Sequence, residues 1–119
     1  MSGPVANPVV HLELRTANLS RACAFYTEAF GWSAETVRAG SLAYLALGLG
    51  DAVGGGVVER EGDPAWLPYV EVAAIDRATE RALRRGAALV VEPREGPAGW
   101  RSIVAAPAGA EIGLWQPKR

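Results

Sequence analysis

The sequence predicts an α+β protein with two tandem βαβββ modules, whose strands form a cupped, half-barrel mixed sheet with the helices outside. Three observations lead to this prediction. The alternating segment Leu12-Glu13-Leu14 returns as Val70-Glu71-Val72, one amphipathic helix follows each segment, and three short strands follow each helix. Each half is too small to bury its own sheet face, so we expect both to form one domain over residues 1–119.

Module one is predicted over residues 9–58. Alternating apolar and polar residues predict a strand at 9–16, and Asn18 or Ser20 can cap a helix that ends at Gly31. Shorter strands are expected near 32–37, 42–47 and 53–58, with turns at 38–41 and 48–51. The polar residues 59–67 are expected to be a linker.

Module two is predicted over residues 68–116. A strand near 69–73 precedes a helix with Asp76 as its expected N-cap, Ile75 and Thr79 on its inner face, and Gly86 after its end. Strands near 88–92, 100–105 and 111–116 follow, and the last two are joined by a turn at 107–109.

Composition restricts the function classes. The 119 residues are 50% hydrophobic and 21% charged with a net charge of −1, which indicates a globular protein and gives no electrostatic signature for nucleic acid or an anionic membrane. One cysteine, Cys23, and one histidine exclude an internal disulfide and Cys-rich or His-rich metal sites. Cys23 is expected to be a buried, inert thiol. With no membrane-length apolar run and no signal-peptide pattern, the expected location is cytoplasmic.

Two segments resemble a known family. The run from His11 to Trp32, with Asn18-Leu19 at the start of its helix and Phe25-Tyr26 before Phe30-Gly31, resembles the opening module of the glyoxalase / bleomycin-resistance / extradiol-dioxygenase group, the vicinal oxygen chelate superfamily. The segment 106–115, Ala-Pro-Ala-Gly-Ala-Glu-Ile-Gly-Leu-Trp, is similar to that family's ending, Asp-Pro-x-Gly-Asn-x-Ile-Glu-Leu. The resemblance covers residues 9–116 and implies the duplicated fold and a homodimer.

Enzymes of this family commonly hold one divalent metal with four side chains, and the resemblance places only one of them here. His11 matches the first ligand position. The second falls within 53–57, where no side chain can coordinate, the third falls on Tyr69, or on Leu67 in a register shifted by two, and the fourth is Gly113. We therefore expect no metal and no cofactor. A rearranged site of His11, Glu13 and Glu111 is the alternative, against which Glu13 could instead pair with Arg15 or Arg101.

The candidate functional residues are those expected to face the cup. His11 and Glu13 are the candidate acid–base pair, although His11 could equally be packed against a cavity wall. Trp32 and Trp66 are more typical of core or interface packing. The candidate ligand-binding residues are Tyr44, Gly55, Tyr69, Glu71, Trp100, Glu111 and Trp115.

These residues favour a metal-free protein that holds a small planar organic molecule in an aromatic-lined cavity. The alternative is an enzyme of the same fold, a lyase, isomerase or dioxygenase, that uses His11 and Glu13. The expected partners are a small-molecule ligand and a second copy of the chain, with neither nucleic acid nor membrane.

Overall fold

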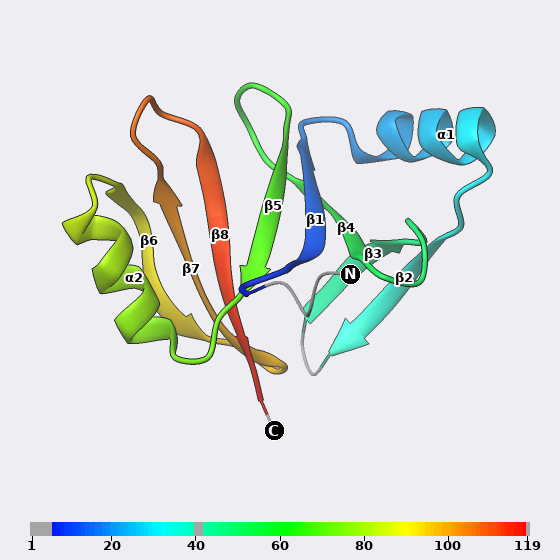
Figure 1. Ribbon diagram of the computed structural model, residues 1–119. Coiled ribbons are helices and arrows are strands. Elements are labelled where there is room, and N and C mark those ends of the chain that lie inside the picture. Colours follow the sequence, from blue (N-terminus) through cyan, green and yellow to red (C-terminus); the bar gives the residue numbers. More distant parts are fainter. Residues whose placement is uncertain (1–5, 40–41, 119) are drawn as a thin grey trace, which may run out of the picture. The chain divides into compact units, whose positions relative to one another are not determined.

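The computed structural model describes residues 6–39 and 42–118 of the chain. These residues form two βαβββ modules, as the sequence predicts (Figure 1). The described elements are β1 (Val9–Thr16), α1 (Leu19–Phe30), β2 (Ala34–Ala39), β3 (Leu42–Leu47), β4 (Gly54–Glu59), β5 (Ala65–Glu71), α2 (Ile75–Arg84), β6 (Ala88–Glu95), β7 (Gly99–Ala105) and β8 (Glu111–Pro117). Part of the turn predicted at 38–41 lies outside the described residues.

The chain divides into two compact units. One unit holds His11–Leu67, and the other joins the residues up to Val10 to those from Pro68 onward. In the first, the strand order is β2-β3-β4-β1, with β1 parallel to β4 and the other neighbours antiparallel. In the second, the order is β5-β8-β7-β6, with β5 parallel to β8 and the other neighbours antiparallel. Both sheets are therefore mixed and share one topology.

Helix α1 begins and ends where the sequence predicts. The Asn18 side-chain oxygen accepts a hydrogen bond from the Arg21 backbone N–H at 3.0 Å, which satisfies one of the free donors of the first turn. Gly31 adopts a left-handed φ of 70°, and its N–H donates to the Thr27 carbonyl at 2.9 Å. Asn18 and Gly31 thus provide local signals for the start and the end of this helix, and the Leu19 N–H also donates to Glu59 Oε2 at 3.5 Å.

Helix α2 starts differently from the prediction. Its N-cap residue is Ala74, which makes no side-chain capping bond, and Asp76 lies inside the first turn, where its charge favours the helix dipole. The Ile75 N–H instead donates to the Gln116 side-chain oxygen at 2.8 Å. Because Gln116 is 41 residues away in the sequence, no local pattern could reveal this cap.

The predicted linker is shorter than expected. Strand β5 already begins at Ala65, so only residues 60–64 connect it to β4. Leu67 of β5 is buried, which favours a strand at this position.

Each helix packs on one face of the sheet of its own module. In module one, Leu14, Leu47 and Val57 form a buried cluster against Ala22 and Tyr26 of α1. In module two, Val72, Ile75 and Leu114 form the equivalent cluster against α2. We call the opposite side of each sheet its far face. Among the described residues, neither helix is long and apolar enough to cross a membrane.

Candidate functional site

The far face of module one carries three of the predicted site residues. The buried Leu14 and Val57 are paired between β1 and β4 and face α1, so the alternate residues His11 and Glu13 face the other way. Leu45 pairs with Val57 and packs against the same cluster, so its neighbour Tyr44 also lies on the far face. The predicted placement of His11 and Glu13 on one face is therefore observed, and Tyr44 lies on the same face.

The electrostatics of this face favour a neutral imidazole beside a carboxylate. Burial lowers the pKa of His11 below its ordinary value of 6.5, and the Glu13 charge opposes this shift in part. Arg15 Nε donates to Glu13 Oε2 at 3.4 Å, so Glu13 is paired with Arg15 rather than with Arg101. His11 is consequently uncharged at neutral pH and able to accept a proton.

The three glycines of β4 do not share one environment. Gly55 pairs with Leu12 on the helix face, and a Cβ on it would lie 2.6 Å from Leu49 Cγ and 2.7 Å from the Leu47 carbonyl oxygen. Gly56 pairs with Glu13 on the far face, and its Cβ would lie 3.3 Å from His11 Nε2. The close approach expected at Gly55 therefore occurs against the protein's own core, and Gly56 is the glycine next to His11.

The far face of module two carries all but one of the site residues that were predicted in this module. Val70 and Leu114 are paired and face α2, so the alternate pairs, Tyr69 with Gly113 and Glu71 with Trp115, occupy the far face. Glu111 shares the parity of Gly113 and lies on the same face, opposite Ala105 of β7.

Trp100 is the exception. It pairs with Gln116 and packs against the cluster beneath α2, so it lies on the helix face and not beside Trp115. Lys118 Nζ sits 5.5 Å from the centre of its ring. Successive side chains of β7 point to opposite faces of the sheet. Arg101, one residue later, pairs with Trp115 and therefore lies on the far face.

The Tyr69 ring lies directly over Gly113. A Cβ on Gly113 would overlap Tyr69 Cδ2, so the ring fills the space that any side chain at Gly113 would need. Tyr69 is only 4% exposed, and its hydroxyl accepts a hydrogen bond from Arg101 Nη1 at 3.0 Å. An aromatic–glycine pair with a guanidinium at its edge therefore lies on this face, on the neighbouring strands β5 and β8.

Sequence reasoning missed Arg94 and Arg101 as functional candidates. Arg94 of β6 pairs directly with Arg101 of β7, so both point to the far face of module two. Arg101 and Ile103 are two residues apart in the strand predicted at 100–105, so side-chain alternation could have placed Arg101 on the same face as Ile103. For Arg94 no signal existed, because irregular pairing between Val91 and Arg94 shifts its register.

The residues present do not fit a metal held in the family's manner. The four ligand positions correspond to two cross-strand pairs, His11 with Gly54 and Tyr69 with Gly113. Neither glycine has a side chain that could bind a metal. Across the described ranges, no three His, Cys, Asp or Glu side chains gather as a metal site. Among these described residues, His11, Glu13 and Glu111 therefore do not form the alternative metal site.

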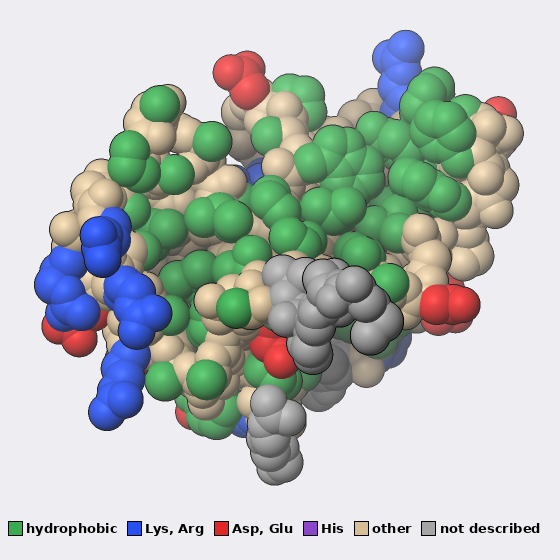
Figure 2. Space-filling view, viewed as in Figure 1, with side chains coloured by type: hydrophobic (Ala, Val, Ile, Leu, Met, Phe, Trp, Pro, Cys, Tyr) green, Lys and Arg blue, Asp and Glu red, His purple; other side chains and the backbone are tan. Residues whose placement is uncertain are grey.

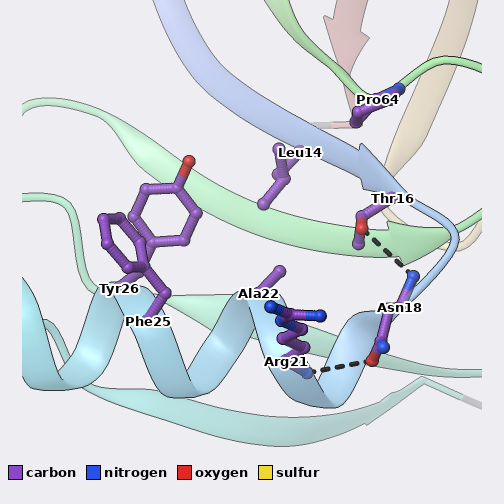
Figure 3. Close-up of a pocket in the computed structure, with 8 residues that line it drawn as sticks. All are labelled: Leu14, Thr16, Asn18, Arg21, Ala22, Phe25, Tyr26 and Pro64. Carbon is purple, nitrogen blue, oxygen red and sulfur yellow. Dashed lines mark hydrogen bonds between the residues drawn. The ribbon is translucent and has the colours of Figure 1, made fainter.

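Two hollows lie in module one, away from most of the predicted site. The first, of ≈ 350 Å³, opens between β1 and α1 (Figure 3). In that view Arg21 and Asn18 lie at one end and Phe25 and Tyr26 at the other. A second hollow of ≈ 360 Å³ includes Tyr44 in its lining. The lining of the first is Leu14, Thr16, Asn18, Arg21, Ala22, Phe25, Tyr26 and Pro64, with none of the predicted site residues.

Aromatic side chains gather on α1. Figure 2 shows hydrophobic side chains over this helix, where Phe25 and Phe30 are 57% and 58% exposed. Tyr26 stacks on Trp32 with ring centres 5.6 Å apart, and it contacts Trp66 edge-on at 5.4 Å. Trp32 and Trp66 therefore pack against Tyr26 of the helix, as the packing interpretation predicts.

Cys23 lies among these helix contacts rather than on a far face. It is half-buried and packs against the cluster of Leu14, Leu47 and Val57. Burial raises the pKa of its thiol, so the thiol is protonated at neutral pH and is a poor nucleophile.

Solved structures share this fold at low sequence identity. A hypothetical protein of Bacillus halodurans matches with a TM-score of 0.71 and 12% identity over 94% of this chain and 95% of its own. Methylmalonyl-CoA epimerase of Mycobacterium tuberculosis matches with a TM-score of 0.65 and 18% identity over 100% of this chain and 93% of its own. Both matches extend over the two modules.

Sequence comparison gives the family. The curated "Putative glyoxylase CFP32" of Mycobacterium tuberculosis is 31% identical over 117 residues, 91% of this chain, and the protein of that name in Mycobacterium bovis matches equally. The chain spans 45% of the length of these relatives. The family model of the glyoxalase, bleomycin resistance protein and dioxygenase superfamily matches residues 9–114. The chain therefore belongs to the Glyoxalase/Bleomycin resistance protein/Dioxygenase superfamily.

Proposed function

We propose that this chain binds a small planar organic molecule without a resident metal, on the far face of module two. The observation that carries the proposal is the Tyr69 ring lying over Gly113. At the two positions of this module that the family resemblance assigns to metal ligands, the chain has a buried aromatic ring and a buried glycine in place of a histidine and a carboxylate.

The neighbouring residues suit a planar ligand. Trp115 lies two residues along β8 from Gly113 on the same face. Aromatic side chains bind flat molecules with large contact area and little loss of side-chain freedom. Stacking on Trp115, with Tyr69 fixed beside it, would supply affinity without a metal.

A paired titration tests this proposal. Stripped protein is titrated calorimetrically with Mn²⁺, Fe²⁺, Ni²⁺ and Zn²⁺, and a panel of planar aromatic compounds is screened by quenching of tryptophan fluorescence. We expect weak metal binding that His11→Ala and Glu111→Gln leave unchanged, and saturable ligand binding that Trp115→Leu abolishes. Trp66→Leu, which removes a tryptophan of module one, is the matched control and should retain binding.

The contrary result is equally specific. Tight one-to-one metal binding that is lost in both His11→Ala and Glu111→Gln would overturn the metal-free proposal. Ligand binding that survives Trp115→Leu would show that the far face of module two is not the site.

A second candidate function rests on His11. A neutral, half-buried imidazole two residues from a carboxylate on the same face is suited to general acid–base catalysis. If His11 acts in this way, we expect slow exchange of a carbon-bound hydrogen in an enolisable carbonyl compound. NMR in deuterated buffer measures this exchange. His11→Gln should abolish the exchange, whereas His11→Gln with an unchanged exchange rate would eliminate the candidate.

The homodimer implied by the family resemblance is a further proposal. Sedimentation equilibrium of the purified chain checks it directly, since a dimer has twice the 12.5 kDa mass of the monomer.

A further inference from the structure

We infer that Arg94 and Arg101 form an anion subsite beside Trp115, and that the ligand is a planar organic anion with a carboxylate or similar oxyanion on its ring system. The inference rests on the proposed function, because it names the ligand class of the same face.

The sheet register places Arg94 and Arg101 side by side on neighbouring strands. Arg94 and Arg101 are directly opposite each other on β6 and β7, and Arg101 is directly opposite Trp115 on β8. Neighbouring strands lie about 4.8 Å apart, so the three side chains form a row across the far face. Like charges directly opposite on adjacent strands repel each other, and an anion between them would convert this repulsion into attraction.

The protein supplies no carboxylate for this pair. Among residues 6–39 and 42–118, no acidic side chain lies within salt-bridge distance of Arg94 or Arg101. Glu95, the nearest in sequence, pairs with Lys118 at 2.8 Å. On the same face, Glu71 is opposite Trp115 and so a strand farther away. Glu111 also shares this face, but it is opposite Ala105, four residues along β7 from Arg101.

Tyr69 holds Arg101 in position. The buried hydroxyl accepts one N–H of Arg101 at 3.0 Å, and the ring is itself confined over Gly113. A guanidinium has five N–H donors, so the remaining donors are available to an oxyanion. Fixing the guanidinium before binding reduces the entropy lost when a ligand is bound.

The chemistry of the row defines the ligand. Guanidinium groups match carboxylate, sulfonate and phosphate oxygens with two parallel hydrogen bonds, and a tryptophan ring stacks on a flat organic body. An inorganic anion would satisfy only the arginines, and a neutral ring only Trp115. A planar molecule that carries an oxyanion uses all three residues.

Matched probes test the inference. The affinities of 2-naphthoate and its neutral analogue 2-naphthamide are compared by tryptophan fluorescence at constant ionic strength. We expect naphthoate to bind about tenfold or more tightly than the amide, because charged hydrogen bonds are the stronger class. Arg101→Gln should remove this preference and Arg94→Gln should reduce it, with amide affinity unchanged. Arg77→Gln, an arginine on α2, is the control and should preserve the preference.

Two further measurements separate this inference from the proposed function. Tyr69→Phe retains the ring over Gly113 but loses the hydroxyl, so it should weaken naphthoate and leave naphthamide unaffected. Inorganic phosphate should raise the melting temperature of wild type more than that of Arg101→Gln.

Three outcomes are decisive. Equal binding of both naphthalenes, or a preference that survives Arg101→Gln, would overturn the anion subsite and leave planar-ligand binding intact. Binding of neither naphthalene, with phosphate still stabilising wild type but not Arg101→Gln, would overturn the proposed function together with the planar ligand class, and would leave only the anion subsite. Failure of the naphthalenes and of phosphate would overturn both.

Discussion

The two modules share one topology but stabilise their helices differently. Helix α2 buries Ile75 and Thr79, whereas no residue of α1 is fully buried. Phe25 and Phe30 of α1 remain more than half exposed. The comparison shows that a repeated βαβββ pattern preserves strand order and register while the packing behind each sheet varies independently.

The far faces differ in the same way. Module one has His11 and Glu13 opposite glycines, and module two has Tyr69 over Gly113 with arginines at its edge. Corresponding strand positions therefore carry acid–base groups in one module and an aromatic surface with positive charge in the other.

The largest expected effect is on the helix cores. Ile75→Ala should lower the free energy of unfolding by about 2–5 kcal/mol, because it leaves a cavity in the cluster beneath α2. Phe30→Ala on α1 should cost at most about 1 kcal/mol, because that ring is largely exposed. Urea unfolding of both variants measures the difference. Equal losses would show that the two helices are anchored equally well.

The second contrast is between the far-face glycines. Gly113→Ala should cost about 1–3 kcal/mol, because the new Cβ would overlap the Tyr69 ring. Gly56→Ala should cost less, since its Cβ would lie 3.3 Å from the tip of the His11 ring, which can shift. Thermal unfolding ranks the two variants. A larger loss from Gly56→Ala would contradict the placement of Tyr69 over Gly113.

A third contrast concerns two threonines. Thr79 Oγ1 donates to the Ile75 carbonyl at 2.7 Å and lies 2.8 Å from Ser102 Oγ, so Ser102 is the donor to Thr79. Thr79→Val removes the acceptor of a fully buried hydroxyl and should cost about 1–2 kcal/mol. Thr27→Val on α1 breaks only a part-buried bond to the Cys23 carbonyl and should cost less. Comparable losses in denaturant titrations would argue against a polar anchor specific to α2.

The smallest expected effect is the pH dependence that His11 gives to module one. Because the folded pKa lies below the ordinary 6.5, the unfolded chain binds more protons between those two values. The free energy of unfolding should therefore fall as the pH drops from 6.5 toward the folded pKa, and then level off. His11→Gln should lack this fall when urea unfolding is measured across that range. The same slope in both proteins would assign it to another group.

Much of the fold followed from the sequence, because the repeated strand alternation, the Asn18 cap and the Gly31 end are local signals. The start of α2 did not, because its cap comes from Gln116 in another strand. The early start of β5 was also missed, since burial of Leu67 depends on distant residues.

The candidate site was predictable only in part. Side-chain alternation along β1, β5 and β8 correctly placed His11, Tyr69 and Trp115 opposite the helices. The prediction was wrong for Gly55 and Trp100, which lie on the helix face. Their orientation depends on the pairing of β4 and β7 with neighbouring strands.

The sequence by itself thus determined the family, the duplicated topology and the loss of metal-ligating side chains at glycine positions, since each is encoded in local pattern or residue identity. Only the tertiary structure decided that Tyr69 covers Gly113, that Arg94 meets Arg101 and that Gln116 caps α2. The contacts of Tyr69 and Gln116 join segments that are distant in the chain, and the pairing of Arg94 with Arg101 depends on the irregular register between β6 and β7.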